Sequence, residues 1–158
     1  MKFREAVEII PSLGQAWQTG LSALRSVDRE RVRAEDTRRL KGSVDLDSTL
    51  KSTLPNDPRW DYAIGYHHTN LRAEVVYWVE VHPASDGEIK VVLKKLEWLK
   101  QWLRETAPRL NSMRREFIWI SSGKTSLTLT APQQKQFALQ GLQHKGRVFQ
   151  IPNEAASL

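Results

Sequence analysis

Asp61, Glu80 and His82 are the residues of this chain whose types and spacing are best suited to chemistry. Two carboxylates and an imidazole supply oxygen and nitrogen donors that together can hold one hard divalent cation. Such an ion can orient a water molecule and stabilise negative charge on a phosphoryl group. These three residues are therefore the candidate ligands for Mg²⁺ or Mn²⁺.

The three side chains are expected to meet because they flank a predicted β-hairpin. Residues 60–66 are aromatic and β-prone, and residues 74–82 form an apolar run after a short polar turn. In an antiparallel pair, the start of the first strand lies beside the end of the second, which makes Asp61 a neighbour of Glu80. Glu80 and His82 are two positions apart on one strand, so their side chains point to the same face.

A structural role explains the same residues, and the sequence leaves both interpretations open. Asp61 stands at a strand start and can cap the preceding loop, while Glu80 can pair with a nearby arginine or lysine. His82 precedes Pro83 and can hydrogen-bond the turn there. Burying a charge at the end of an apolar strand without a partner is costly, which favours the functional interpretation.

Helices are predicted on both sides of the hairpin. Apolar residues at helical spacing predict one helix from residue 11 to about 33 and another over residues 89–104. A third helix opens at Pro132 and runs to about residue 142. Residues 42–47 alternate and predict a short strand or the start of a short helix.

The strands that follow the hairpin predict the fold class. Buried or alternating segments indicate strands at 117–120, 126–130 and 147–151. A strand, a helix and a strand in succession form a parallel, right-handed crossover. We therefore expect one α/β domain over residues 1–158, with a mixed central sheet flanked by helices and a frayed tail at 152–158.

With these elements around Asp61 and Glu80, the sequence resembles the PD-(D/E)xK nuclease superfamily, also called the restriction-endonuclease-like fold. The resemblance covers roughly residues 13–122 in the order of elements and only a few residues in detail. It implies a core of a helix, a hairpin carrying the aspartate, a strand ending in (D/E)xK, a helix and a further strand. By this resemblance, Asp61 is the metal-binding aspartate and Glu80 the second metal ligand of a nuclease.

The lysine of that motif is replaced here by His82. The family lysine orients and polarises the attacking water, so the resemblance implies that His82 binds metal or acts as a base near neutral pH. A lysine from the following helix, Lys90 or Lys94, is the alternative, since these two share a helix face. The predicted catalytic residues are thus Asp61, Glu80, His82 and Lys94.

Composition limits the partners and the classes of site. The net charge of +6 predicts attraction to nucleic acid, because each neutralised phosphate releases counterions. The chain has no cysteine, which excludes disulfides, thiolate zinc sites and cysteine nucleophiles and suits a cytoplasmic location. No apolar stretch approaches the roughly 18 residues of a membrane helix, so we expect no membrane contact.

Two non-catalytic functions fit the same residues. The fold can serve as a nucleic-acid-binding module in which the loss of the motif lysine has ended catalysis. It can also serve as a protein-interaction module that binds a protein partner or forms a homodimer, its charge serving only to solvate the surface.

Overall fold

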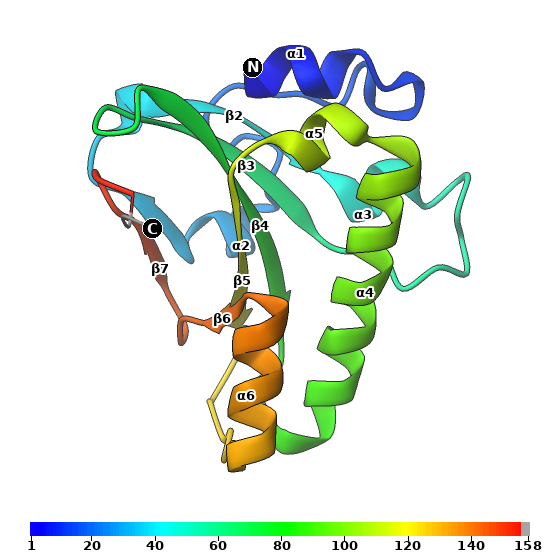
Figure 1. Ribbon diagram of the computed structural model, residues 1–158, viewed down its shortest axis with the longest axis vertical. Coiled ribbons are helices and arrows are strands. Elements are labelled where there is room, and N and C mark those ends of the chain that lie inside the picture. The colour runs from blue at the N-terminus through cyan, green and yellow to red at the C-terminus, as the bar shows by residue number, and fades with distance from the viewer. Residues whose placement is uncertain (156–158) are drawn as a thin grey trace.

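The computed structural model describes residues 1–155 and has a five-stranded mixed sheet at its centre (Figure 1). The first three strands in the sheet order are antiparallel to their neighbours, and the last three are parallel. Helices flank this sheet, which confirms the predicted α/β class with a mixed central sheet. The order across the sheet is β2 (Leu40–Asp45), β3 (Tyr62–His68), β4 (Ala73–His82), β5 (Arg115–Ser121) and β6 (Leu142–His144).

The predicted hairpin is confirmed as the antiparallel pair β3 and β4. Its turn falls slightly later than expected, because β3 continues to His68. Tyr62 pairs with Val79, so the residue before Tyr62 lies beside the residue after Val79. The hairpin therefore brings Asp61 next to Glu80, as the antiparallel geometry requires.

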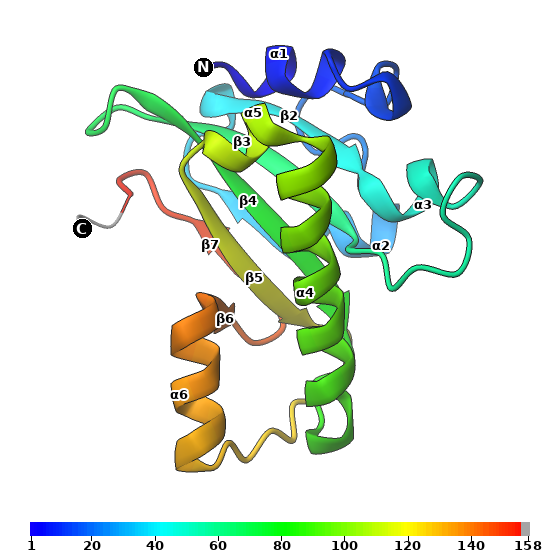
Figure 2. The same ribbon diagram turned by 45° about the vertical axis from the view of Figure 1, so that its right-hand side comes forward.

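One face of the sheet is covered by four helices. The longest is α4 (Ile89–Thr106), which crosses the sheet after β4 and returns the chain to β5 (Figure 2). Its buried residues recur at helical spacing, as predicted, and pack on Trp78 and Trp119 of the sheet. The others are α1 (Phe3–Glu8), α5 (Pro108–Ser112) and α6 (Ala131–Gln140).

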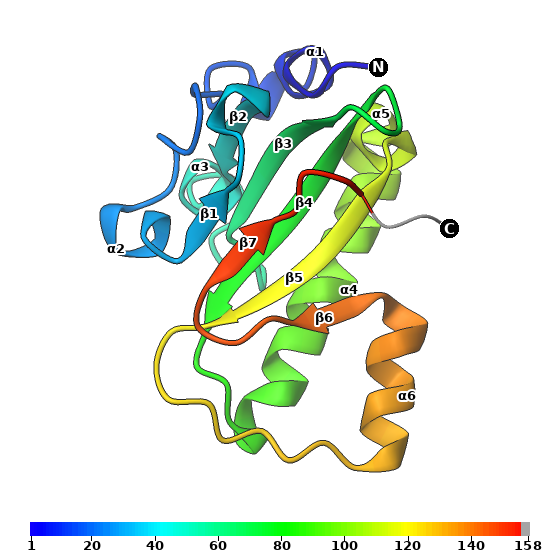
Figure 3. The same ribbon diagram turned by 90° about the vertical axis from the view of Figure 1, so that its left-hand side faces the viewer.

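The opposite face carries a small parallel ribbon of β1 (Val32–Ala34) and β7 (Phe149–Ile151), with α2 (Ser26–Arg29) nearby (Figure 3). Phe149 and Ile151 are buried there against alternate residues of the central strands, such as Tyr77 and Ile118. Strands β3, β4 and β5 are thus covered on both faces, which explains why β4 is apolar throughout.

The predicted helix over residues 11–33 is wrong. This stretch instead forms the 3₁₀ turn η1 (Pro11–Leu13), an irregular segment, α2 and β1. Gly20 interrupts it with a φ of 52°, a left-handed conformation that ends a helix. The apolar residues that suggested one stripe separate in space, since Leu13 packs in the helix-covered core and Leu24 in the ribbon-covered core.

Other segments differ from expectation because their pairing is long-range. Residues 126–130 form no strand and contribute one isolated bridge, Ser126 with Ser85. The predicted third helix ends two residues earlier, at Gln140, which leaves Leu142–His144 to pair as β6. Short elements complete the chain: α3 (Leu46–Leu50), η2 (Thr37–Arg39) and η3 (Asp86–Glu88).

The first part of the predicted frayed tail packs on the end of the hairpin. Asn153 accepts a hydrogen bond from the Tyr66 hydroxyl (3.3 Å), and its carbonyl lies 3.1 Å from His68 Nδ1. Asn70 and Ala155 exchange two further hydrogen bonds. Residues 156–158 lie outside the described residues, so the prediction is not tested there. Among residues 1–155, no helix is long and apolar enough to cross a membrane.

Gly65 provides a test of the packing between the hairpin and α1. A Cβ atom at this position would lie 2.6 Å from the Phe3 ring, closer than atoms in contact can approach. We expect Gly65→Ala to lower the free energy of unfolding by about 1–3 kcal/mol, because the fully buried Phe3 has no room to move. Urea denaturation measures this change. Gly123→Ala, where an added Cβ meets nothing within 4 Å, is the matched control, and equal stability of the two variants would contradict the packing.

Candidate active site

Asp61 and Glu80 lie side by side where β3 begins and β4 ends, as predicted. The Asp61 backbone N–H donates to Glu80 Oε1 (3.2 Å), and the Val81 N–H donates to Asp61 Oδ2 (2.9 Å). The Glu80 side chain is fully buried, and that of Asp61 is 17 % exposed. These reciprocal hydrogen bonds hold two carboxylates at one sheet edge on the face that α4 covers.

Lys95 supplies the positive charge between the two carboxylates. Its amine donates to Glu80 Oε2 and lies 3.9 Å from Asp61 Oδ1. The sequence interpretation missed this lysine, although a signal was present. Val92, Lys95, Leu96 and Leu99 follow the i, i+3, i+4, i+7 pattern of the buried stripe of α4, so Lys95 is a charge on an apolar face.

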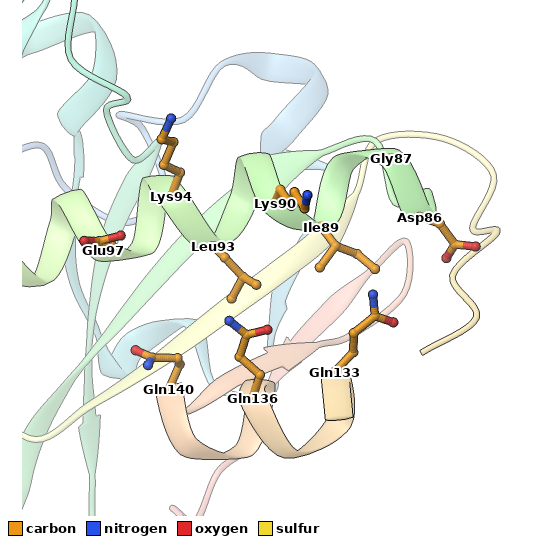
Figure 4. A pocket seen from close by; sticks show the side chains of 10 residues that line it. All are labelled: Asp86, Gly87, Ile89, Lys90, Leu93, Lys94, Glu97, Gln133, Gln136 and Gln140. Carbon is orange, nitrogen blue, oxygen red and sulfur yellow. The ribbon is translucent and has the colours of Figure 1, made fainter. Parts of the chain in front are cut away.

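The structure does not bring Lys94, the predicted catalytic lysine, to the carboxylates. Lys94 and Lys90 are exposed and line a pocket of about 720 Å³ between α4 and α6. In Figure 4, Ile89 and Leu93 point from α4 towards α6, whereas Lys94 points away from α6. Successive residues of a helix are rotated by about 100°, so neighbouring lysines serve different surfaces.

The other wall of this pocket is formed by glutamines. Gln133, Gln136 and Gln140 project from α6 towards α4 in Figure 4. The N-terminus of this helix is closed by a capping box, in which Thr130 and Gln133 bond each other's backbone N–H groups. The pocket is thus a separate feature, since neither Asp61 nor Glu80 lines it.

His82 reaches Glu80, as expected, but it also contacts a carboxylate that the sequence interpretation missed. Its Nδ1 lies 3.4 Å from Glu80 Oε2, and its Nε2 lies 2.7 Å from Glu88 Oε2. The hydrogen bond to Glu80 raises the pKa of His82 above its ordinary value; burial opposes this, and Glu88 adds to it. With a carboxylate at each nitrogen, His82 is placed to orient Glu80, and neither nitrogen is left open for a metal ion.

Asp61 carries the strongest electrostatic signature in the site. Burial, and next the neighbouring Glu80 carboxylate, raise the pKa of Asp61 to about 8. Lys95 and the Val81 N–H act in the opposite direction without cancelling this rise. At neutral pH the pair therefore takes up a proton readily, and a cation bound there would replace that proton.

The donor set fits a small hard cation bound through few protein ligands. Mg²⁺ is commonly held by one or two carboxylates, with water and substrate phosphates completing its shell. Asp61 and Glu80 supply such a pair. Within residues 1–155, no group of three or more His, Cys, Asp or Glu side chains is arranged to hold a metal ion.

Asp47 provides a third carboxylate near Asp61, and its charge adds to the rise that burial and Glu80 cause in the pKa of Asp61. The N–H groups of Leu46 and Asp47 donate to the Asp61 carbonyl at 2.8 and 3.3 Å, which ties the start of α3 to the site. Asp47 pairs with Arg59 (3.0 Å). Asp45 caps α3 by accepting from the Ser48 N–H (2.9 Å).

Comparisons with known proteins returned no match among family models, curated proteins or solved structures.

Replacing Lys95 tests whether it balances the buried Glu80. We expect Lys95→Met to lower the free energy of unfolding by about 3 kcal/mol, because the fully buried carboxylate loses its principal cation. Chemical denaturation at pH 7 measures the loss. Lys94→Met removes the same charge from the neighbouring exposed position and should change stability by no more than about 0.5 kcal/mol. If the two variants lose equal stability, Lys95 does not have this role.

The raised pKa of Asp61 predicts a pH dependence of stability. Between the ordinary aspartate pKa near 4 and the folded value of about 8, the unfolded chain releases this proton and the folded chain retains it, so stability falls as pH rises. Asp61→Asn removes that loss. The free energy of unfolding of the variant, relative to that of the wild type, should therefore rise by about 1–2 kcal/mol from pH 5 to pH 8. The release of one proton changes this free energy by at most about 1.4 kcal/mol per pH unit.

Thermal unfolding in EDTA at several pH values measures this difference. Asp86→Asn, at an exposed aspartate, controls for the change of side chain. An advantage that is constant with pH would show that Asp61 ionises normally in the folded protein.

Proposed function

We propose that this protein is a metal-dependent phosphodiesterase of the PD-(D/E)xK type that acts on nucleic acid. In this proposal Asp61 and Glu80 hold Mg²⁺ or Mn²⁺, and Lys95 takes the role of the motif lysine that is absent from position 82. The observation that carries the proposal is the meeting of Asp61, Glu80 and Lys95 at one sheet edge.

This arrangement is poorly explained by stability alone. Two carboxylates in contact repel each other, and burial makes their ionisation more costly still. Apolar residues of similar volume commonly serve a core as well as a buried ion pair, or better. Perturbed carboxyl groups of this kind gather at functional sites, and Asp61 has such a perturbed pKa.

The order of elements supports the proposal from the hairpin onward, since α4 crosses over from the antiparallel pair β3 and β4 to the parallel strand β5. The helix expected before the hairpin is not formed over residues 11–33, and the short helix α1 lies upstream instead. The aspartate stands at the start of β3 and the glutamate near the end of β4, the places that the sequence resemblance implies. The lysine comes from α4, one element later than in the motif.

The roles of the residues follow from their contacts. A bound Mg²⁺ or Mn²⁺ would supply Lewis-acid stabilisation of a phosphoryl oxygen and a more acidic water. Lys95 points its ammonium group at the same carboxylates, where it can orient a water molecule and offset negative charge. His82 holds Glu80 in place and is itself held by Glu88, so both act as positioning residues.

A second candidate is a non-catalytic nucleic-acid-binding module of the same fold. The observation that favours it is the internal pairing of the site. Glu80 Oε1 accepts from the Asp61 N–H, and its Oε2 contacts both Lys95 and His82. A metal ion would have to replace part of this network, whereas the charge of +6 attracts a polyanion without any metal.

Cleavage of supercoiled plasmid with Mn²⁺ or Mg²⁺ separates the two candidates. We expect the wild-type protein to nick the plasmid and Glu80→Gln to abolish nicking, because the amide carries no charge for the metal. Glu97→Gln makes the same change at an exposed position of α4 and should leave the rate within about twofold of the wild type.

Metal binding gives an independent readout of the same proposal. A ligand at 100 times its dissociation constant stabilises the folded state by about 2.7 kcal/mol, so Mn²⁺ should raise the unfolding temperature of the wild type but not of Glu80→Gln. No cleavage and no stabilisation with either metal would reject the enzyme. Salt-dependent DNA binding that is unaffected by Glu80→Gln would then support the binding module.

A further inference from the structure

Arg25 lies at the edge of the candidate active site and has no strong partner there. Its guanidinium Nη2 is 4.0 Å from Asp47 Oδ2, too far for a hydrogen bond, and its side chain is 65 % exposed. Asp47 belongs to the site, since its N–H and that of Leu46 bond the Asp61 carbonyl. Arg25 is therefore a cation drawn towards the carboxylates and still open to solvent.

Asp47 does not need Arg25 as a partner, because Arg59 already serves that purpose. Arg59 Nε lies 3.0 Å from both Asp47 Oδ1 and the Asp47 carbonyl, and its Nη1 donates to the Leu54 carbonyl at 2.6 Å. The Arg59 side chain is 10 % exposed, as expected of a brace within the fold. The two arginines near Asp47 thus differ in kind, since one is built into the protein and the other faces outward.

The backbone of Arg25 is held in place by hydrogen bonds, although its side chain is largely exposed. The Arg25 N–H donates to the Tyr62 hydroxyl (3.4 Å), and that hydroxyl donates to Asp28 Oδ2 (2.5 Å). Arg29 donates to the Leu24 carbonyl (3.0 Å), which secures the preceding turn. This anchor fixes the backbone of Arg25 relative to the start of β3, with the Tyr62 side chain in the core on the ribbon-covered face of the sheet.

The negative charge of the candidate active site explains why an exposed arginine would be needed near it. Asp47, Asp61 and Glu80 present carboxylates at one edge, and a polyanionic substrate would be repelled without cations around them. Arg59 and Lys95 are already committed to those carboxylates. The exposed guanidinium of Arg25, 4.0 Å from Asp47 Oδ2, suits phosphate binding, because its planar fork matches two phosphate oxygens.

We propose that Arg25 binds a backbone phosphate of the nucleic-acid substrate, next to the phosphodiester that lies at Asp61 and Glu80. This assignment rests on the proposed function. It makes Arg25 a substrate-binding residue that positions the strand across the sheet edge, in addition to the groups that act on the scissile bond.

Binding of a fluorescently labelled DNA duplex in EDTA tests the assignment without cleavage. We expect Arg25→Ala to weaken binding about tenfold at low salt and to reduce the slope of log K against log salt by about 1. Arg25→Lys should recover part of the affinity, since lysine keeps the charge but loses the fork. The fold should be unaffected, because Asp47 keeps Arg59.

Arg38→Ala is the matched control. Arg38 is also an exposed arginine paired with an aspartate, Asp36, and its side chain is 89 % exposed. It precedes β2, whereas the carboxylates lie beyond the other end of that strand. Removing it changes net charge equally, and we expect less than a twofold effect on binding. Equal losses in the two alanine variants would overturn the assignment of Arg25.

Plasmid cleavage with Mn²⁺, measured in parallel, separates this inference from the proposed function. Cleavage by the wild type together with equal binding of Arg25→Ala and Arg38→Ala would overturn only the role of Arg25. Binding that depends on Arg25 without cleavage under either metal would support the role of Arg25 and reject only the catalytic proposal.

Discussion

Glu80 is a fully buried carboxylate at the end of a buried strand, and its charge has to be balanced by groups from other parts of the fold. Asp61 brings a backbone N–H but also a second negative charge. Lys95 brings the opposite charge from α4, and His82 brings an imidazole held by Glu88. The relative positions of the hairpin, the crossover helix and the turn between them are therefore tied to this one carboxylate.

The architecture explains how these groups converge. Antiparallel pairing of β3 with β4 sets Asp61 beside Glu80, and the face of β4 that carries Trp78 also carries Glu80. Because α4 covers that same face, a lysine on its buried stripe has to meet the carboxylate. The ribbon of β1 and β7 covers the other face, so the central strands are buried on both sides and the pairing of Glu80 is less screened by solvent.

This concentration of carboxylates is a cost to the folded state, which Lys95 offsets only in part. The pKa of Asp61 rises to about 8 because the fold buries it beside Glu80, so the stability of the fold depends on the protonation of this pair. Two arginines lie near Asp47 and differ in burial. The Arg59 side chain is largely buried and pairs with Asp47 at the start of α3, whereas Arg25 is exposed.

The sequence by itself determined the hairpin, the meeting of Asp61 with Glu80, and the helix that follows, because short-range periodicity and antiparallel geometry specify them. The spacing of α4 also placed Lys95 on the buried stripe and Lys94 off it, since one residue turns a helix by about 100°, but only the packing of α4 on β4 shows that Lys95 meets Glu80. The helix expected at 11–33 does not form, and tertiary packing is again the reason. Its apolar residues pack in two separate cores, and the parallel pairing of β1 with β7 joins segments more than a hundred residues apart, which no local pattern encodes.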